Sequence, residues 1–274
     1  MDDHAHCLDV LRMHDRDRYL SSLLYPEKYR DDCVALYAFN AEIARVRDVV
    51  SEPMPGEIRL QWWRDAIAND DKSARANPLA NALSEVIVKH NLPRDAFDKM
   101  LLARAFDLYD DPMPSMVDFE GYAGETTSLL FQLSALIAGA EPSSQLAQCC
   151  GHAGVSYALI TILRDLPRHA SRGQLYLPAD ILKESGAQPT LILGGDMHEG
   201  LSKALIKMIA LCRDHRQKAT ASLGELPSSL RPVFLPLCLI EPHLRKMEKA
   251  GFNPFADRMK ISQLRAQWVL WRGR

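Results

Sequence analysis

Hydrophobic residues recur at helical spacing along almost the whole chain. Apolar positions three or four residues apart mark one face of an α-helix. In residues 31–50, for example, Val34, Ala38 and Ala41 fall on one stripe. The same spacing predicts further helices over residues 59–68, 78–90, 93–109, 119–139, 151–168, 201–223, 228–250 and 261–271. The pattern is therefore that of an almost entirely helical protein.

The segments between these helices carry typical turn residues. Proline and glycine are concentrated at residues 53–56, 110–114, 194–195 and 251–254. Only residues 174–177 alternate in a way that admits a short strand, so we do not expect an α/β sheet. No internal repeat, low-complexity tract or change of composition divides the chain. We expect one all-α domain that spans residues 1–274.

Composition and charge narrow the range of functions. The chain has 274 residues and 47% hydrophobic content, enough for a sizeable core. It has 33 Lys and Arg against 35 Asp and Glu, a net charge of -2, which argues against nucleic-acid binding through a basic surface. The six cysteines lack the spacing of a zinc site or a disulfide framework, so we expect reduced thiols in the core.

The start of the chain and its apolar runs bear on membrane association. Residues 1–7 are polar and acidic, unlike a secretory signal, and we expect His4 and His6 to lie in a mobile terminus. The longest apolar runs, residues 129–140 and 232–240, are too short to span a bilayer. We therefore expect a protein that is soluble or, at most, peripheral to a membrane.

Charged residues gather at the end of the apolar helix predicted over 151–168. Asp165 and His169 are four residues apart and share a helix face. Arg168 and Arg172 have the same spacing and can hold an anion between their guanidinium groups, with Arg164 beside them. The alternative is an ordinary charged helix end, in which arginines complement the helix dipole.

A second buried-looking helix, within residues 35–52, also becomes charged toward its end, and with the first segment it resembles the squalene/phytoene synthase family. The resemblance runs through most of the chain. It rests on a Tyr-x-Ser-Ser…Pro element at 19–26, Leu-Tyr-Ala-Phe at 36–39, Trp62 and Trp63, Tyr122 before a helix of small residues, Ile-Leu-Arg-Asp at 162–165 and Arg-Gly-x-x-Tyr-Leu-Pro at 172–178. The last two motifs are the most specific.

This resemblance implies an isoprenoid-synthase-type helical bundle around a central cavity. In active members, two Asp-x-x-x-Asp motifs on facing helices hold Mg²⁺, which neutralises the leaving diphosphate of a prenyl substrate. An apolar, aromatic cavity then shields the carbocation. The candidate catalytic residues are Asp165, which the resemblance places in the second motif, and Asp48, which stands next to an aspartate position of the first. The implied substrate-binding residues are Tyr37, Arg47, Tyr122, Arg164, Arg168, Arg172 and Tyr176.

The carboxylates of these motifs are mostly replaced. Alignment with the family puts Arg47 and Ser51 at the two aspartate positions of the first motif, and His169 beside Asp165 in the second. An arginine in place of an aspartate reverses the local charge and repels Mg²⁺. Metal binding then depends on other ligands, and Asp48 is the first of them.

Three possibilities are left open at this site. Asp48 and Glu52 form an i, i+4 pair, turned roughly 100° around the helix, that can bind a metal ion together with Asp165. His169 and Asp165 can instead bind a softer metal. In the third possibility, Arg47, Arg164 and Arg172 neutralise a diphosphate directly. Asp107, Asp110 and Asp111 end another helix beside prolines; they can face the mouth of the cavity, but we expect them in a solvated loop.

Further residues are similar to the degenerate branch of the family that contains a mitochondrial complex I assembly factor. They include Gln61 to Trp63 and the closing Trp268, Trp271 and Arg272. Two hypotheses follow. One is a protein that binds or transfers prenyl groups from isoprenoid diphosphates with weak or altered activity, using Mg²⁺ if active. The other is a non-catalytic assembly or scaffold factor with a client protein. For either, we expect a bacterial cytoplasmic protein, with the inner-membrane surface as an alternative location.

Overall fold

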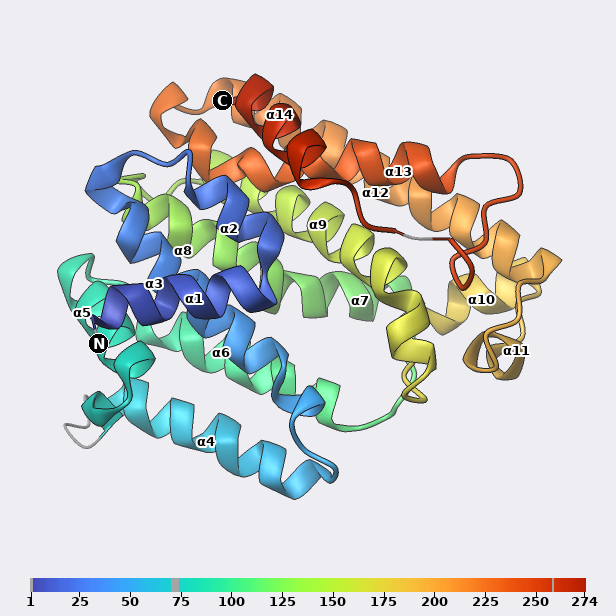
Figure 1. Cartoon of the computed structure of the whole chain (residues 1–274), viewed down its shortest axis with the longest axis horizontal. Coiled ribbons are helices and arrows are strands. Elements are labelled where there is room, and N and C mark those ends of the chain that lie inside the picture. Colours follow the sequence, from blue (N-terminus) through green and yellow to red (C-terminus); the bar gives the residue numbers. More distant parts are fainter. Residues whose placement is uncertain (1, 70–73, 258) are drawn as a thin grey trace.

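The computed structural model describes residues 2–69, 74–257 and 259–274, and within them it contains helices and no β-strand (Figure 1). The all-α prediction is confirmed. Residues 174–177, where a short strand was admissible, have an irregular conformation. The helices are α1 Asp3–His14, α2 Arg16–Ser22, α3 Glu27–Ala44, η1 Val46–Asp48, α4 Pro53–Asn69, η2 Ala74–Ala76, α5 Pro78–Lys89, α6 Arg94–Arg104, η3 Ala105–Leu108, α7 Met116–Ala123, η4 Gly124–Ser128, α8 Leu129–Ile137, α9 Ser144–Ala170, α10 Ala179–Ser185, α11 Pro189–Leu193, α12 Glu199–Glu225, η5 Ser228–Leu239, α13 Ile240–Met247 and α14 Gln263–Gly273.

Helix α9 is the core of the bundle. It packs along α12 and is also in contact with η4, α8 and α13 (Figure 1). Its length and composition are those of a membrane span, which the expectation from the shorter apolar runs overlooked. However, 72% of its apolar window is buried inside the bundle, so its hydrophobicity is explained by core packing.

The N-terminal residues, expected to be mobile, form helix α1. Asp2 caps this helix by accepting a hydrogen bond from the His4 backbone N–H. Cys7 and Leu11 are fully buried, and α1 packs against α3 and α5. The buried stripe of α1 is narrow, and the charged residues around it conceal it in the sequence.

Helix α3 ends six residues earlier than the sequence pattern predicts. The helix stops at Ala44, and residues 46–48 form the 3-10 turn η1. Three valines between positions 46 and 50 disfavour the α-helix, and so does the position of Glu52 directly before Pro53. Asp48 and Glu52 therefore do not share the face of one helix, as a metal-binding pair there requires.

A π-helical turn interrupts the helix predicted over residues 119–139. This turn, η4, separates α7 from α8 and crosses α9 at Gly154. A Cβ atom at Gly154 would lie 2.4 Å from the Ser128 backbone, so only glycine allows the two segments to approach so closely. In the same way, residues 228–250 form the 3-10 segment η5 followed by α13, because Pro232 and Pro236 remove backbone donors.

Candidate functional site

The structure places the end of η1 against the last turns of α9. The Arg168 guanidinium joins the two segments: its Nη1 donates to Asp48 Oδ2 at 3.1 Å, and its Nη2 donates to Asp165 Oδ2 at 2.9 Å. Arg172 also donates to the Asp48 carboxylate. We call these four residues the arginine clamp. Its two arginines and two aspartates neutralise one another at the rim of the bundle.

The clamp is an anion site of the kind that the spacing of Arg168 and Arg172 predicts. Both guanidinium groups hold one carboxylate, that of Asp48, so the bound anion belongs to the chain itself. The side chains of Arg168 and Arg172 are 48% and 39% exposed. An external diphosphate that binds both groups would compete with Asp48 for them.

Arg47 does not face Asp165, contrary to the alignment of the first motif. Its Nη1 donates to the Val50 carbonyl at 3.1 Å, and its Nη2 lies 3.3 Å from each carboxylate oxygen of Asp110. Asp48 is the residue of this segment that faces α9. Because η1 replaces the last turns of the predicted helix, the directions of residues 47 and 48 differ from those inferred for a continuous helix.

The carboxylates near the clamp do not fit a Mg²⁺ ion. Asp48 and Asp165 are both paired with arginines, and Glu52 is exposed in the bend before α4. Mg²⁺ needs free oxygen ligands and is repelled by nearby guanidinium groups. Among the described residues, no group of three or more His, Cys, Asp or Glu side chains is placed to hold a metal ion.

His169 is equally poor as a ligand for a softer metal. Its Nε2 lies 3.5 Å from Arg168 Nη2, and its ring centre lies 4.7 Å from that of Tyr176. Burial, together with the positive charge of Arg168, lowers the pKa of His169 to about 4. The imidazole is therefore neutral, but a cation approaching it meets the guanidinium of Arg168.

Arg164 lies beside the clamp, with its Nε 3.9 Å from Asp165 Oδ1, but its hydrogen bond goes to the N-terminal part of the chain. Its Nη1 donates to Asp17 Oδ2 in α2. Burial alone would raise the pKa of Asp17, but the charge and hydrogen bond of Arg164 outweigh it, so the pKa lies below its ordinary value. Arg164 thus connects α9 to α2. Its guanidinium group, which was predicted to bind substrate, is bound to the carboxylate of Asp17 instead.

A buried cation lies beside Tyr37 inside the bundle. The guanidinium carbon of Arg18 is 5.7 Å from the ring centre of Tyr37 and 4.5 Å from that of Tyr157, and Arg18 is only 6% exposed. Its Nη1 bonds Asp15 Oδ2 at 2.6 Å. The sequence interpretation missed Arg18; the only signal was a run of alternating charges at residues 15–18. A fixed cation over these rings opposes a second cation there.

Tyr122 and Tyr176 converge on Asp107, which was expected in a solvated loop. Asp107 is 7% exposed, and its Oδ1 accepts hydrogen bonds from Tyr122 at 2.8 Å and from Tyr176 at 2.9 Å. Arg104 Nη1 lies 3.0 Å from Asp107 Oδ2. We call these four residues the Asp107 cluster. Asp110 and Asp111, in contrast, are exposed as predicted.

The Asp107 cluster acts as a structural joint. Burial raises the pKa of both Tyr122 and Tyr176 well above the ordinary value, with Asp107 adding to the shift, so both phenols stay protonated and donate. The cluster connects the end of α6, helix α7 and the segment after α9. Its hydrogen bonds are made within the chain, so the two tyrosines are held in place without a ligand.

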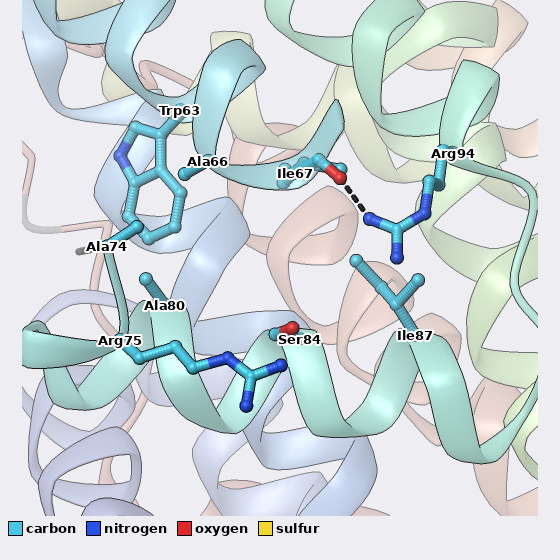
Figure 2. Close-up of a pocket in the computed structure, with 9 residues that line it drawn as sticks. All are labelled: Trp63, Ala66, Ile67, Ala74, Arg75, Ala80, Ser84, Ile87 and Arg94. Atoms are coloured by element: carbon cyan, nitrogen blue, oxygen red, sulfur yellow. Dashed lines mark hydrogen bonds between the residues drawn. The ribbon is translucent and has the colours of Figure 1, made fainter. Parts of the chain in front are cut away.

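A groove is lined mainly by the N-terminal helices and does not include the four clamp residues. It has a volume of about 600 Å³ and opens between α1, α4, α5 and the end of α3. Its lining is His6, Val10, Glu42, Val46, Ile58, Arg59, Trp62, Trp63, Asn77 and Leu79. None of the predicted substrate-binding residues is among them. Figure 2 shows a second space, bordered by Trp63 and by Arg94, which donates to the Ile67 carbonyl. At about 10 Å³, that space is at the lower limit for one water molecule.

Comparison with known proteins defines the family. The model of the squalene/phytoene synthase family matches residues 11–272, so the chain belongs to this family. Two solved structures have the same fold. A dehydrosqualene synthase in complex with ligand has a TM-score of 0.84 and 17% identity, with coverage of 99% of this chain and 95% of that chain. Squalene synthase HpnC from Alicyclobacillus acidocaldarius has a TM-score of 0.78 and 20% identity, with coverage of 92% and 95%.

Among curated proteins, the relatives include assembly factors. NADH dehydrogenase (ubiquinone) complex I, assembly factor 6 from Rattus norvegicus is 30% identical over 257 residues, 93% of this chain and 76% of the rat protein. Phytoene synthase from Thermus thermophilus is 25% identical over 259 residues, 93% of this chain and 86% of that protein. The predicted membership of the family, and the likeness to its complex I assembly branch, are confirmed.

Proposed function

We propose that this chain is a non-catalytic member of the squalene/phytoene synthase family that assists assembly of an NADH dehydrogenase complex by binding a client protein. The observation that carries this proposal is the bridge from Asp48 through Arg168 to Asp165. It neutralises the carboxylates that face each other between η1 and α9. The likeness to complex I assembly factor 6 supplies the kind of client.

The chemistry of prenyl transfer argues in the same direction. Ionisation of a prenyl diphosphate requires cations that neutralise the leaving group, and Mg²⁺ supplies that charge when bound. Here Arg168 and Arg172 are already neutralised by Asp48 and Asp165. The guanidinium of Arg18, which is paired with Asp15, already lies over the rings of Tyr37 and Tyr157, so these rings are less available to a carbocation. As a location we propose the cytoplasmic side of a bacterial inner membrane, where such a client is assembled.

A second candidate function is binding of an isoprenoid diphosphate without turnover. It is favoured by one observation: Arg168 and Arg172 are partly exposed and already hold an anion between them. The ligand would exchange with the carboxylate of Asp48. An Asp48→Asn variant should then bind farnesyl diphosphate more tightly than the wild type, because the competing internal anion is gone.

A direct assay separates catalysis from its absence. The purified protein is incubated with farnesyl or geranylgeranyl diphosphate and Mg²⁺, and released pyrophosphate is measured while binding is followed in parallel. We expect no release above the rate without protein. Release that Asp165→Ala abolishes would overturn the non-catalytic proposal.

A genetic assay tests the assembly role. In the organism that encodes this chain, deletion of its gene should reduce both the amount of assembled NADH dehydrogenase complex and NADH oxidation in membranes. The wild-type gene and an Asp165→Asn variant should restore both equally, because the carboxylate serves no reaction. An unchanged complex after deletion, or complementation by the wild type alone when both proteins accumulate equally, would contradict the proposal.

A further inference from the structure

Helix α14 presents an apolar surface that the fold leaves uncovered. It lies at the outer edge of the bundle, at the C-terminal end of the chain (Figure 1). Its inner face packs on η5 and α2, with Ala266 and Leu270 buried. On its outer face, Leu264, Trp268 and Trp271 are 79%, 56% and 67% exposed. The helix thus has a buried side and an equally apolar exposed side.

The exposed residues form a continuous stripe. At about 100° of rotation per residue, positions 264, 268 and 271 fall within roughly 60° of one another on the helix surface. Ala266 and Leu270 point to the other side, where the bundle is. Two exposed tryptophans in such a short stripe are unusual for a surface that remains in water, because each ring buries a large apolar area when it finds a partner.

Positive charge surrounds this stripe. Residues 259–274 contain Lys260, Arg265, Arg272 and Arg274, all exposed, and no Asp or Glu. The guanidinium carbon of Arg272 lies 4.8 Å from the Trp268 ring centre. Arg16 of α2 adds a further exposed cation, since its Nη2 bonds Gln263 Oε1 at 3.4 Å. This local surplus contrasts with the net charge of -2 for the whole chain.

We propose that α14 is an interfacial anchor that binds the surface of an anionic lipid bilayer. Tryptophan prefers the depth of the lipid headgroups, where its ring is apolar and its N–H stays hydrated. The flanking arginines and lysine attract anionic headgroups, each cation adding to binding near the surface. The helix lies in the plane of the membrane, because its inner face stays packed on the bundle. This inference does not depend on the proposed assembly role.

Vesicle binding by the full-length protein tests the anchor. Vesicles of phosphatidylcholine alone are compared with vesicles that contain phosphatidylglycerol at a 70:30 ratio, and bound protein is measured by flotation. We expect binding to the anionic vesicles and at least about tenfold weaker binding to the neutral ones, with further loss as salt is raised. No binding to anionic vesicles, or equal binding to both, would overturn the proposal.

Two variants separate the apolar and the electrostatic parts. Trp268→Ala with Trp271→Ala should weaken binding about tenfold or more, and Arg265→Glu with Arg272→Glu should do the same. Val117→Ala, a substitution of a 76% exposed residue on α7, is the matched control and should bind as the wild type does. All these side chains are exposed, so the thermal midpoint should stay close to that of the wild type.

Other occupants of the surface give different results. If α14 binds a second copy of the chain, the wild type is a dimer by light scattering and the tryptophan variant a monomer, with no response to lipid. If it binds an acidic protein, the arginine variant loses the client but vesicle binding is absent throughout. Either result would overturn the lipid proposal and identify a protein as the partner of α14.

Discussion

The arginine clamp and the Asp107 cluster are built from the same groups but in different surroundings. In each, arginine holds an aspartate: Arg168 holds Asp48 and Asp165 in the clamp, and Arg104 holds Asp107 in the cluster. The clamp lies at the rim, with the Arg168 side chain 48% exposed, whereas the Asp107 side chain is 10% exposed. Exposed ion pairs contribute little to stability, and buried ones are costly to break. We infer that the clamp determines what chemistry is excluded, while the cluster determines whether this part of the bundle is held together.

The largest effect is expected from Asp107→Ala. This change leaves Arg104 as a buried charge without its carboxylate and removes the acceptor of two tyrosine hydroxyls, so we expect a loss of about 3–5 kcal/mol in unfolding free energy. Asp110→Ala is the matched control: Asp110 is 49% exposed and, within the described part of the chain, is paired with Arg47, so its loss should stay within about 1 kcal/mol. Urea unfolding at neutral pH measures both. Equal losses would remove the distinction between the two regions.

A pH-dependent effect is expected from His169. Its pKa of about 4 in the folded protein lies below the ordinary 6.5, so the unfolded state takes up the proton first as pH falls. The full stability is present above pH 6.5, and about 2–3 kcal/mol is lost between pH 6.5 and 4.5. In His169→Gln this loss should shrink. His243 has a similarly lowered pKa of about 4, so His243→Gln is the parallel variant, and the double variant should show the flattest profile.

A small effect is expected when the clamp is opened. Arg168→Ala leaves Asp48 with Arg172, and Asp165 within 3.9 Å of Arg164 Nε, so neither carboxylate is isolated. The unfolding free energy should change by no more than about 1 kcal/mol. A loss as large as that of Asp107→Ala would mean that the clamp is a structural element after all.

The smallest effect is the response of the wild type to Mg²⁺. Because arginines occupy both carboxylates, millimolar Mg²⁺ should leave the thermal midpoint unchanged. The double variant Arg168→Ala with His169→Asp removes the bridging cation and restores an i, i+4 carboxylate pair, so it should be stabilised by Mg²⁺. A shift of the thermal midpoint in the wild type alone would show that its carboxylates do bind Mg²⁺ despite the neighbouring arginines.

The helical fold and the family are accessible from the sequence because they depend on local spacing and short motifs. The spacing of Arg168 and Arg172 also predicts an anion clamp, since both lie on one helix. The spacing does not predict which anion the two arginines bind, because Asp48 is 120 residues away from Arg168 in the chain. The directions of Arg47 and Asp48 were assigned for a helix that in fact ends at Ala44, and on a helix one residue changes direction by roughly 100°.

The sequence also does not predict which charged residues are buried. Asp107 stands beside Asp110 and Asp111 and two prolines, a typical loop composition. It is buried because Tyr122 and Tyr176, 15 and 69 residues further on, reach it from other segments. Arg18 likewise looks like part of a charged turn until α2 packs into the bundle. The polarity of a single residue does not predict contacts with residues from distant segments of the chain.

The bridge through Arg168 also bears on how the protein can change over generations. Substituting His169 by Asp alone adds a carboxylate next to a guanidinium that already holds two, so no metal ligand is set free. Substituting Arg168 alone removes the bridge but leaves Asp48 with Arg172, Asp165 near Arg164, and His169 in place of the second motif's partner. An i, i+4 carboxylate pair without a bridging guanidinium thus requires at least two changes in this segment. Under the proposed non-catalytic role, neither single substitution creates a metal site, so selection for metal binding has no one-step path in this segment.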